Sequence, residues 1–356
     1  EIPLRLVGSE MCIRDSRKRC ENEVLGYTGK PDSYYNAIIN WVKQRYDLIV
    51  TKEVINFVPG IVPGIGMAMN CFTQKGDKVM IQPPVYHPFA WVTTRNERTL
   101  VINPLRWENG MYRMDLDAFR EQIKGCKLFI LCNPHNPGGV VWTEAELRAI
   151  ADICYDEKVL VFSDEIHADL TLPPHTHRPF ATVSEKARMN SVTFMSPSKA
   201  FNMPGLSASH ALIFNEDLRK RFRIYMDAGE LDMGHVFAFL SVEAAYSHGT
   251  EWLDQCLAYI QGNIDFVDDF LKNHAPKIKA IRPEASYLVW LDCRELKLSQ
   301  KDLNEFFVDK AHLALNDGEM FGKEGIGFMR LNVASPRCII EKAMKQLADA
   351  YQLYIK

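Results

Sequence analysis

The stretch Ser191-Val-Thr-Phe-Met-Ser-Pro-Ser-Lys-Ala-Phe-Asn202 joins a short apolar run to a lysine. Residues 191–195 carry the β-branched and aromatic side chains that are typical of a strand buried on both faces. Lys199 follows that run, and Ala200-Phe-Asn202 continues in a helix-like pattern. The sequence therefore predicts a strand, a tight turn that holds Lys199, and the start of a helix.

Two further apolar runs also lead into polar side chains. Val159-Leu-Val-Phe-Ser163 is followed by Asp164, and Lys127-Leu-Phe-Ile-Leu131 is followed by a turn sequence that contains Asn136. Ligands of parallel sheets bind beyond the carboxyl ends of the strands. We therefore expect Lys199, Asp164 and Asn136 to meet at one edge of a sheet.

Strand-like and helix-like patterns alternate from about Asp32 to Ser247. This alternation is typical of a mostly parallel sheet with helices on both faces. The capping-box sequence Thr143-Glu-Ala-Glu146 marks one helix start. The predicted strands are 54–57, 78–81, 99–102, 127–131, 159–163 and 191–195, and the predicted helices are 33–45, 65–72, 116–123 and 143–156.

The pattern changes after about Ser247, where a long helix-like stretch leads to three short apolar runs and a terminal helix. We predict an α/β fold with a large domain, residues 31–248, whose mostly parallel sheet lies between helices. A smaller α+β domain, residues 249–356, would be completed by residues 1–30. The predicted elements of this smaller domain are helices 251–273 and 339–354 and strands 279–281, 287–291 and 328–332.

The first sixteen residues, through Ser16, differ from the rest of the chain. They show no clear helix or strand period, and they lack the apolar core of a signal peptide. We interpret them as a truncated or foreign N-terminus, such as a sequence-assembly junction. A short disordered arm is the alternative.

Composition excludes several classes of protein. Of the 356 residues 24% are charged, and the net charge of −3 gives no basic field for nucleic acid or an anionic membrane. No apolar run approaches the roughly 20 residues of a membrane span. The nine cysteines, an odd number without regular spacing, argue against a disulfide framework and indicate a cytoplasmic protein. Cys132 is expected to be a buried thiol rather than a nucleophile.

A lysine, a carboxylate and an amide at neighbouring strand ends are what an enzyme needs to hold pyridoxal phosphate. The lysine forms an imine with the cofactor, and the carboxylate keeps the pyridine nitrogen protonated so that the ring can accept electrons. The simpler interpretations are a surface lysine, an N-cap aspartate and a plain Asn-Pro-Gly turn. The joint occurrence of Lys199, Asp164 and Asn136 favours the cofactor.

Further motifs support this interpretation. They are Val24-Leu-Gly-Tyr-Thr28, Pro83-Pro-Val-Tyr-His87, Cys132-Asn-Pro-His-Asn-Pro-Gly138, Ser163-Asp-Glu-Ile-His167, Ser196-Pro-Ser-Lys-Ala-Phe-Asn202, Ser286-Tyr-Leu-Val-Trp290 and Phe328-Met-Arg-Leu-Asn-Val333. Together they resemble the aminotransferase superfold of pyridoxal-phosphate enzymes (class I/II, fold type I). Within it, they look most like the branch of cystathionine β-lyases and other carbon–sulfur β-lyases. The resemblance runs from about Arg17 to the C-terminus.

The resemblance implies roles for the residues around the cofactor ring. Lys199 would bind the cofactor and, once displaced by substrate, remove the Cα proton. Asp164 would pair with the pyridine nitrogen, while Glu165 would point the opposite way along the strand end. Asn136 and His167 would lie near the phenolic oxygen of the cofactor.

Three further residues near the predicted site have simpler interpretations. Tyr86 would stack on the cofactor ring, with a core tyrosine as the alternative. Asn133 would serve only its turn. A lone histidine such as His167 would more often be structural, but the resemblance places one at this position.

The phosphate would lie on Gly60-Ile61-Val62-Pro-Gly64, ahead of the predicted helix 65–72. Glycine permits close backbone approach, and the N–H groups of a first helical turn favour an anion. The run lacks Gly-Lys-Ser/Thr and so is not a nucleotide P-loop, although a plain loop turn is the alternative. Ser196 and Ser198 would add hydroxyl donors.

Two more residues point to the substrate and to a second subunit. Arg330 would bind the substrate α-carboxylate as a bidentate fork, because an arginine inside an apolar strand is costly unless paired. Tyr27 would reach the phosphate and substrate of the neighbouring subunit. The resemblance thus implies a homodimer with a shared active site. A tyrosine that packs within the small domain is the alternative.

The sequence departs from the family pattern at two places. Many aminotransferases carry Gly-Leu-Arg downstream of the lysine, but Gly205-Leu206 is followed here by Ser207. The phosphate then lacks a charged partner, which fits the lyase branch better. The family's usual segment before Tyr27, which closes over the substrate, has no counterpart in the sequence pattern.

The implied function is β-elimination from L-cystathionine or another S-substituted L-cysteine, giving a thiol, pyruvate and ammonia. An aminotransferase with the same residues is the first alternative, and a non-catalytic regulatory protein that keeps the cofactor fold is the second. A metal hydrolase built on His87, His135 and His167 is remote, because no pair has tight ligand spacing on one helix. We expect no metal.

Overall fold

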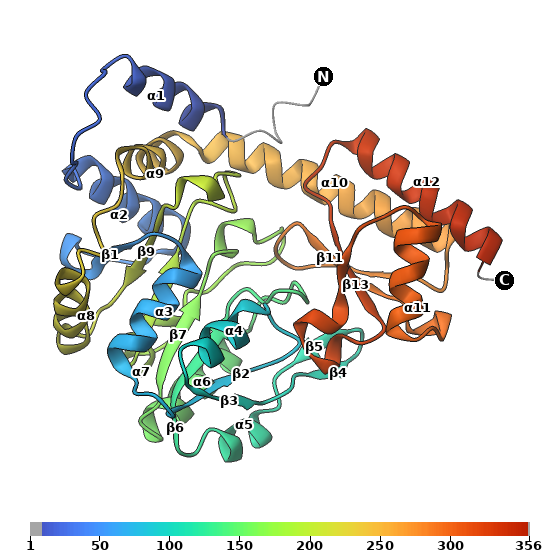
Figure 1. Ribbon diagram of the computed structural model, residues 1–356, viewed down its shortest axis with the longest axis horizontal. Coiled ribbons are helices and arrows are strands. Elements are labelled where there is room, and N and C mark those ends of the chain that lie inside the picture. The colour runs from blue at the N-terminus through green and yellow to red at the C-terminus, as the bar shows by residue number, and fades with distance from the viewer. Residues whose placement is uncertain (1–8, 355–356) are drawn as a thin grey trace.

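A seven-stranded sheet lies at the centre of the larger part of the computed structural model, which describes residues 9–354 (Figure 1). Its order is β1-β9-β8-β7-β6-β2-β3, and all strands run in one direction except β9. The strands are β1 (Ile55–Val58), β2 (Lys78–Ile81), β3 (Thr99–Ile102), β6 (Cys126–Cys132), β7 (Leu160–Asp164), β8 (Ser191–Met195) and β9 (Ser209–Leu212). The predicted mostly parallel sheet is confirmed.

Helices cover both faces of this sheet because its strands are apolar on both sides. In β6, Leu128 and Ile130 pack in one cluster with α3, whereas Phe129 and Leu131 pack in another with α6. The first layer contains α3 (Ile61–Phe72), α4 (Pro88–Arg95) and α8 (Glu216–Ala228), and the second contains α5 (Leu116–Gln122), α6 (Glu144–Asp156) and α7 (Glu185–Met189). A third cluster joins α2 (Asp32–Tyr46) and α9 (Val236–His248) to the sheet edge.

The predicted capping box starts α6. The Thr143 hydroxyl accepts a hydrogen bond from the Glu146 N–H (3.2 Å), and the Glu146 carboxylate accepts one from the Thr143 N–H (2.8 Å). Two donors of the first helical turn are thus satisfied by side chains.

A second, antiparallel sheet forms the smaller part, with the order β10-β11-β13-β12. Its strands are β10 (Lys279–Ile281), β11 (Leu288–Asp292), β12 (Asn316–Asp317) and β13 (Phe328–Asn332). The helices α10 (Thr250–His274), α11 (Gln300–Glu305) and α12 (Arg337–Tyr354) lie beside it, and α10 runs along the top of Figure 1 toward α12. This confirms a smaller α+β part, while the exact boundary at residue 248 stays a prediction.

From Glu10 onward the N-terminal segment is helical rather than a disordered arm, whereas its interpretation as truncated or foreign stays a prediction. Residues Glu10–Cys20 form α1, which packs against α9 rather than against the smaller sheet. Cys12 is the buried residue of this helix and contacts Met203 and the Ser241 carbonyl, while Met11 is partly buried against the same core. Because only one side chain of this helix is fully buried, its sequence shows no apolar pattern with the helical period. The earlier part of the predicted anomalous segment, residues 1–8, lies outside the described residues.

Two other local predictions need correction. No helix starts at Ala200, because the chain turns there: the Met203 N–H bonds to the Ser198 carbonyl (2.8 Å), and Asn202 has a φ of 50°. The helix predicted to start at Ile65 starts at Ile61 instead. The structure also adds a hairpin of β4 (Arg106–Glu108) and β5 (Met111–Arg113). No helix within residues 9–354 is long and apolar enough to cross a bilayer.

Gly139 lies where the two sheets meet. Its carbonyl accepts hydrogen bonds from the N–H groups of Glu284 (2.8 Å) and Ala285 (3.1 Å), and its φ is 68°. A Cβ at this position would lie 2.5 Å from the Cβ of Pro283. The turn after β6 therefore packs directly on the segment before β11.

The Gly139→Ala substitution should lower the free energy of unfolding by about 2 kcal/mol or more. Alanine is unfavourable in this left-handed conformation, and its Cβ would overlap the Cβ of Pro283. Urea denaturation followed by circular dichroism would measure the change. Gly205→Ala is the matched control, since its added Cβ would meet nothing within 4 Å. Equal denaturation midpoints for the two variants would contradict this packing.

Candidate active site

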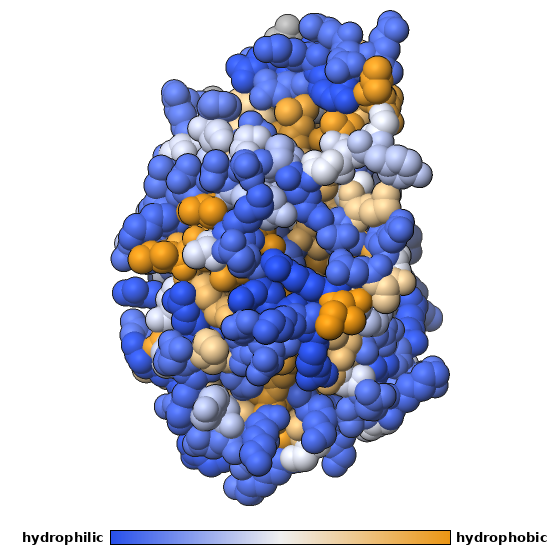
Figure 2. All heavy atoms as spheres, turned by 90° about the vertical axis from the view of Figure 1, so that its left-hand side faces the viewer, coloured by the Kyte–Doolittle hydropathy of each residue, from blue (hydrophilic) through white to orange (hydrophobic). Residues whose placement is uncertain are grey.

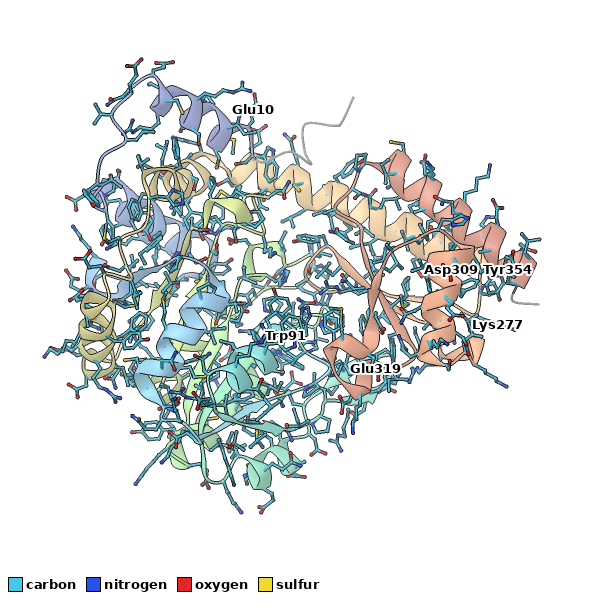
Figure 3. All side chains as sticks on the ribbon, in the orientation of Figure 1. Glu10, Trp91, Lys277, Asp309, Glu319 and Tyr354 are labelled. Atoms are coloured by element: carbon cyan, nitrogen blue, oxygen red, sulfur yellow. The ribbon has the colours of Figure 1, made fainter. Side chains whose placement is uncertain are left out.

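A cavity of about 480 Å³ lies between the carboxyl ends of the parallel strands and the smaller sheet. In Figure 3, Trp91 marks α4 on one side of this region and Glu319 marks the segment before β13 on the other. Every predicted site residue except Ser196 and Tyr27 lines the cavity: Gly60, Ile61, Val62, Tyr86, Asn136, Asp164, His167, Ser198, Lys199 and Arg330. Residues from six separate chain segments thus converge on one space.

Lys199 lies in the turn after β8 and is partly buried. Burial lowers the pKa of its ammonium group, the negative charge of Asp164 opposes that shift, and the positive charge of Arg330 adds to it. The amine is therefore closer to a neutral base than an exposed lysine would be.

Asp164 is the last residue of β7, and its side chain is buried. Burial raises the pKa of the carboxyl group to about 7, with a hydrogen bond from the Ile166 N–H (3.1 Å) as the main opposing effect. A buried carboxylate of this kind needs a cationic partner to remain ionised. The protonated nitrogen of a pyridine ring is such a partner, so the site fits pyridoxal phosphate at this point.

The N-cap interpretation of Asp164 is not what the structure shows. The next helical turn, Ala168–Leu170, begins after His167. Glu165 points away from the cavity, as expected from strand alternation, and is buried against His177.

Arg330 in β13 reaches across from the smaller sheet. Its guanidinium group donates hydrogen bonds to the side-chain oxygens of Asn136 (2.9 Å) and Asn316 (2.7 Å), while its Nε is buried without a partner. Within residues 9–354 no carboxylate forms an ion pair with it. Burial lowers its pKa to about 10, so the group stays charged at neutral pH. An unpaired, partly buried guanidinium is a site for an anionic ligand.

His167 and Tyr86 border the same space. The Nδ1 atom of His167 is buried without a hydrogen-bond partner, and burial, with the charges of Lys199 and Arg330, lowers its pKa to about 3. The imidazole is therefore neutral. Burial and the charge of Asp164 raise the pKa of Tyr86, which keeps this ring a neutral phenol beside the cavity.

The start of α3 provides an anion cradle. Gly60, with a φ of 146°, caps this helix, and the first turn includes Ile61 and Val62. Because α3 begins four residues earlier than predicted, its free N-terminal turn borders the cavity and favours a phosphate there. Ser198 lines the cavity too, together with Ser207 and Ser209.

Ser196 does not face the cavity. Its hydroxyl lies 2.6 Å from the Ala208 carbonyl and 2.8 Å from the Ser198 hydroxyl, so it holds the loop in place. The prediction that Ser196 donates to the phosphate was therefore wrong, because its hydroxyl is already hydrogen-bonded within its own loop. Tyr27 is 97% exposed and lies outside the cavity of its own chain.

Asn133 and Cys132 are the other polar residues of this region that the sequence analysis considered. Asn133 donates to the Arg178 carbonyl (3.1 Å) of another loop, so it does not serve only its own turn as expected. Cys132 borders the cavity, but burial raises the pKa of its thiol and so disfavours a thiolate. Within residues 9–354 no group of three or more His, Cys, Asp or Glu side chains is placed to hold a metal ion.

Sequence reasoning missed several cavity-lining residues: His87, Ser207, Ser209, Tyr287 and Asn332. His87 and Tyr287 stand inside motifs that were already recognised, so their position beside known site residues was the available signal. The two serines come from the antiparallel strand β9 and the loop before it. The family pattern at Gly205-Leu206-Ser207 already pointed to the phosphate, whereas no pattern in the sequence predicts that Ser209 faces the site.

Comparison with known proteins agrees with this geometry. A family profile described as aminotransferase class I and II matches residues 15–347. Cystathionine beta-lyase PatB of Bacillus subtilis is 37% identical, covering 94% of this chain and 87% of that protein.

Two crystal structures are also similar over nearly the whole chain. Cystalysin from Treponema denticola, which contains pyridoxal 5'-phosphate, has a TM-score of 0.94 at 34% identity and covers 97% of this chain and 88% of its own. The PLP-bound C-S lyase from Staphylococcus hominis has a TM-score of 0.89 at 33% identity, covering 96% and 88%. With its motif residues gathered around one cavity, the chain belongs to the aminotransferase class I and II family.

Proposed function

We propose that this protein is a pyridoxal-phosphate-dependent carbon–sulfur β-lyase that cleaves L-cystathionine or another S-substituted L-cysteine to a thiol, pyruvate and ammonia. One observation carries the proposal: Lys199 and the buried Asp164 face the same cavity as Arg330, which has no carboxylate partner in the described part of the chain. Relatives that are named as cystathionine beta-lyase and C-S lyase support this reaction over others of the family.

The cavity has a fitting group for each part of the cofactor. Asp164 would hold the proton of the ring nitrogen, and Asn136 and His167 would face the phenolic oxygen. The first turn of α3 would hold the phosphate, with the hydroxyls of Ser198, Ser207 and Ser209 as further donors. When bound, pyridoxal phosphate supplies an electron sink for negative charge at the substrate Cα.

The residues of this chain would do the rest of the chemistry. Arg330, oriented by Asn136, would hold the substrate α-carboxylate as a fork. Lys199 would then remove the Cα proton, a step that its lowered pKa favours near neutral pH. As the Cβ–S bond breaks, the bonding electrons leave with the sulfur, which takes up a proton to become the thiol.

We also propose a homodimer in which Tyr27 completes the site of the partner subunit. Tyr27, Val24 and Leu25 lie in one extended segment and are 97%, 70% and 64% exposed. Figure 2 shows the face with α2 and α8, where separate hydrophobic side chains lie among hydrophilic ones. Single exposed apolar side chains are normal on a protein surface, but three of them within the four residues 24–27 form a contiguous group of the kind that a partner covers, which supports this proposal.

A reducing compartment, the cytoplasm, is the proposed location. All nine cysteines are free thiols, and six of them are buried. A protein folded in an oxidising compartment would more often use such a number of cysteines in disulfides.

Supplying S-substituted L-cysteines without a keto-acid acceptor tests the reaction. We expect sustained release of thiol and pyruvate, measured with a thiol reagent and a lactate dehydrogenase assay. The Lys199→Ala variant should lose at least about a hundredfold in rate, because it lacks the base. A single turnover that leaves the cofactor in its amine form would instead identify an aminotransferase. Full cofactor loading without any turnover would identify a non-catalytic protein.

Replacing Arg330 with lysine should raise KM for the amino acid about tenfold or more, since a lysine cannot donate a bidentate pair of hydrogen bonds. Steady-state kinetics at saturating cofactor would measure this. Arg282→Lys is the matched control, because Arg282 forms a surface ion pair with Asp265. An unchanged KM in the Arg330 variant would remove this residue from substrate binding.

Subunit mixing tests the shared site. Tyr27→Ala and Lys199→Ala homodimers should each be weakly active, but a mixed dimer has one site with both native residues. Co-expression of the two variants with different affinity tags should therefore restore activity to the doubly tagged fraction. If that fraction is no more active than either parent, Tyr27 does not act across the interface.

A further inference from the structure

Glu165 and His177 form a buried pair directly behind the cofactor residues. The carboxylate of Glu165 is 0% exposed and lies 2.7 Å from Nε2 of His177, whose side chain is 1% exposed. The other carboxylate oxygen accepts hydrogen bonds from the Ser163 hydroxyl (2.8 Å) and the Phe180 N–H (2.8 Å). Three partners thus fix this side chain in a single orientation.

Burying this pair costs folding free energy, which argues that the pair has a role beyond packing. A buried carboxylate is unfavourable relative to an apolar side chain of the same size unless every partner is well placed. Within the described residues, the Nδ1 atom of His177 is also buried and has no hydrogen-bond partner, so only one of the two ring nitrogens is satisfied. An apolar pair would avoid both costs.

The geometry connects the pair to the ends of two central strands. Glu165 follows Asp164, and its backbone N–H bonds to the Phe194 carbonyl of β8 (2.9 Å). The same loop that carries His177 accepts a hydrogen bond from Asn133 at its Arg178 carbonyl (3.1 Å). The loop therefore joins the segment that presents Asp164 to the segment that presents Asn136.

Neither member of the pair reaches the cavity. Glu165 and His177 are absent from its lining, whereas Asp164, one residue away, is part of it. The negative charge of Glu165 also acts on Asp164 and raises the pKa of that carboxyl group. The other charged or titratable groups around the pair are Tyr46, whose ring packs on His177, and Asp169, which Tyr46 contacts.

We propose that Glu165 and His177 are positioning residues that hold Asp164 against the ring nitrogen of pyridoxal phosphate. This inference rests on the proposed function, because it needs that cofactor in the cavity. The pair would fix both the direction and the charge environment of Asp164, without contacting the cofactor.

The test compares two probes: pyridoxal phosphate and its carbon analogue, in which CH replaces the ring nitrogen. Each is titrated into the cofactor-free forms of the native protein and of the Glu165→Gln, His177→Gln and Glu284→Gln variants. The Glu284 variant is the matched control, because Glu284 accepts a hydrogen bond from the Val141 N–H (2.8 Å) and lies 3.8 Å from His175 in the same region.

We expect Glu165→Gln to reduce the preference for pyridoxal phosphate over the carbon analogue about tenfold, since only the natural cofactor has a nitrogen for Asp164 to hold. His177→Gln should act in the same direction and keeps the test decisive if Glu165→Gln does not fold. Glu284→Gln should retain the native preference.

An equal loss of affinity for both probes, or no loss, in the Glu165 and His177 variants would overturn the inference and leave the pair a structural one. If the native protein binds neither probe, the proposed function itself fails, and the inference fails with it. The two failures are therefore distinguishable by the native protein alone.

Discussion

The Asp164 carboxylate is buried at the end of a central strand, where an uncompensated negative charge is costly. The other groups of the site are arranged so that this negative charge can be compensated. Burial raises the pKa of this carboxyl group to about 7, so its charge depends on what lies opposite. In the proposed function, a cofactor with a protonated ring nitrogen would supply the missing positive charge, and it would gain a fixed counter-ion that maintains its electron-withdrawing form.

The same reasoning explains the mixture of charge states in the cavity. Lys199 and Arg330 are both partly desolvated cations, and their charges help to keep His167 neutral. Arg330 remains charged because its pKa is still about 10. The site therefore combines an amine whose pKa is lowered with a guanidinium that stays charged, and this difference fits the proposed roles of Lys199 as a base and Arg330 as a carboxylate anchor.

The site exists only because two sheets meet. Arg330 of the smaller sheet bonds to Asn136 of the larger part, and the Val85 N–H bonds to the Phe321 carbonyl (2.9 Å) across the same boundary. Gly139 allows the two backbones to approach at this contact. The residues proposed to anchor the substrate and those proposed to bind the cofactor are thus linked mechanically, because hydrogen bonds join the two parts of the chain.

The sequence by itself determined the parallel sheet, and most of the site residues that it predicted do face the cavity, since apolar runs and the residues that end them are local features. It also predicted that Asp164 and Glu165 would diverge, because alternation along a strand is local too. Only the tertiary structure decided the rest. The hydroxyl of Ser196 is hydrogen-bonded within its own loop, Ser209 reaches the site on the antiparallel strand β9 and Ser207 in the loop before it, and α1 packs on α9 with Cys12 buried and Met11 partly buried. These outcomes depend on contacts between distant segments, and no periodicity within one segment encodes them.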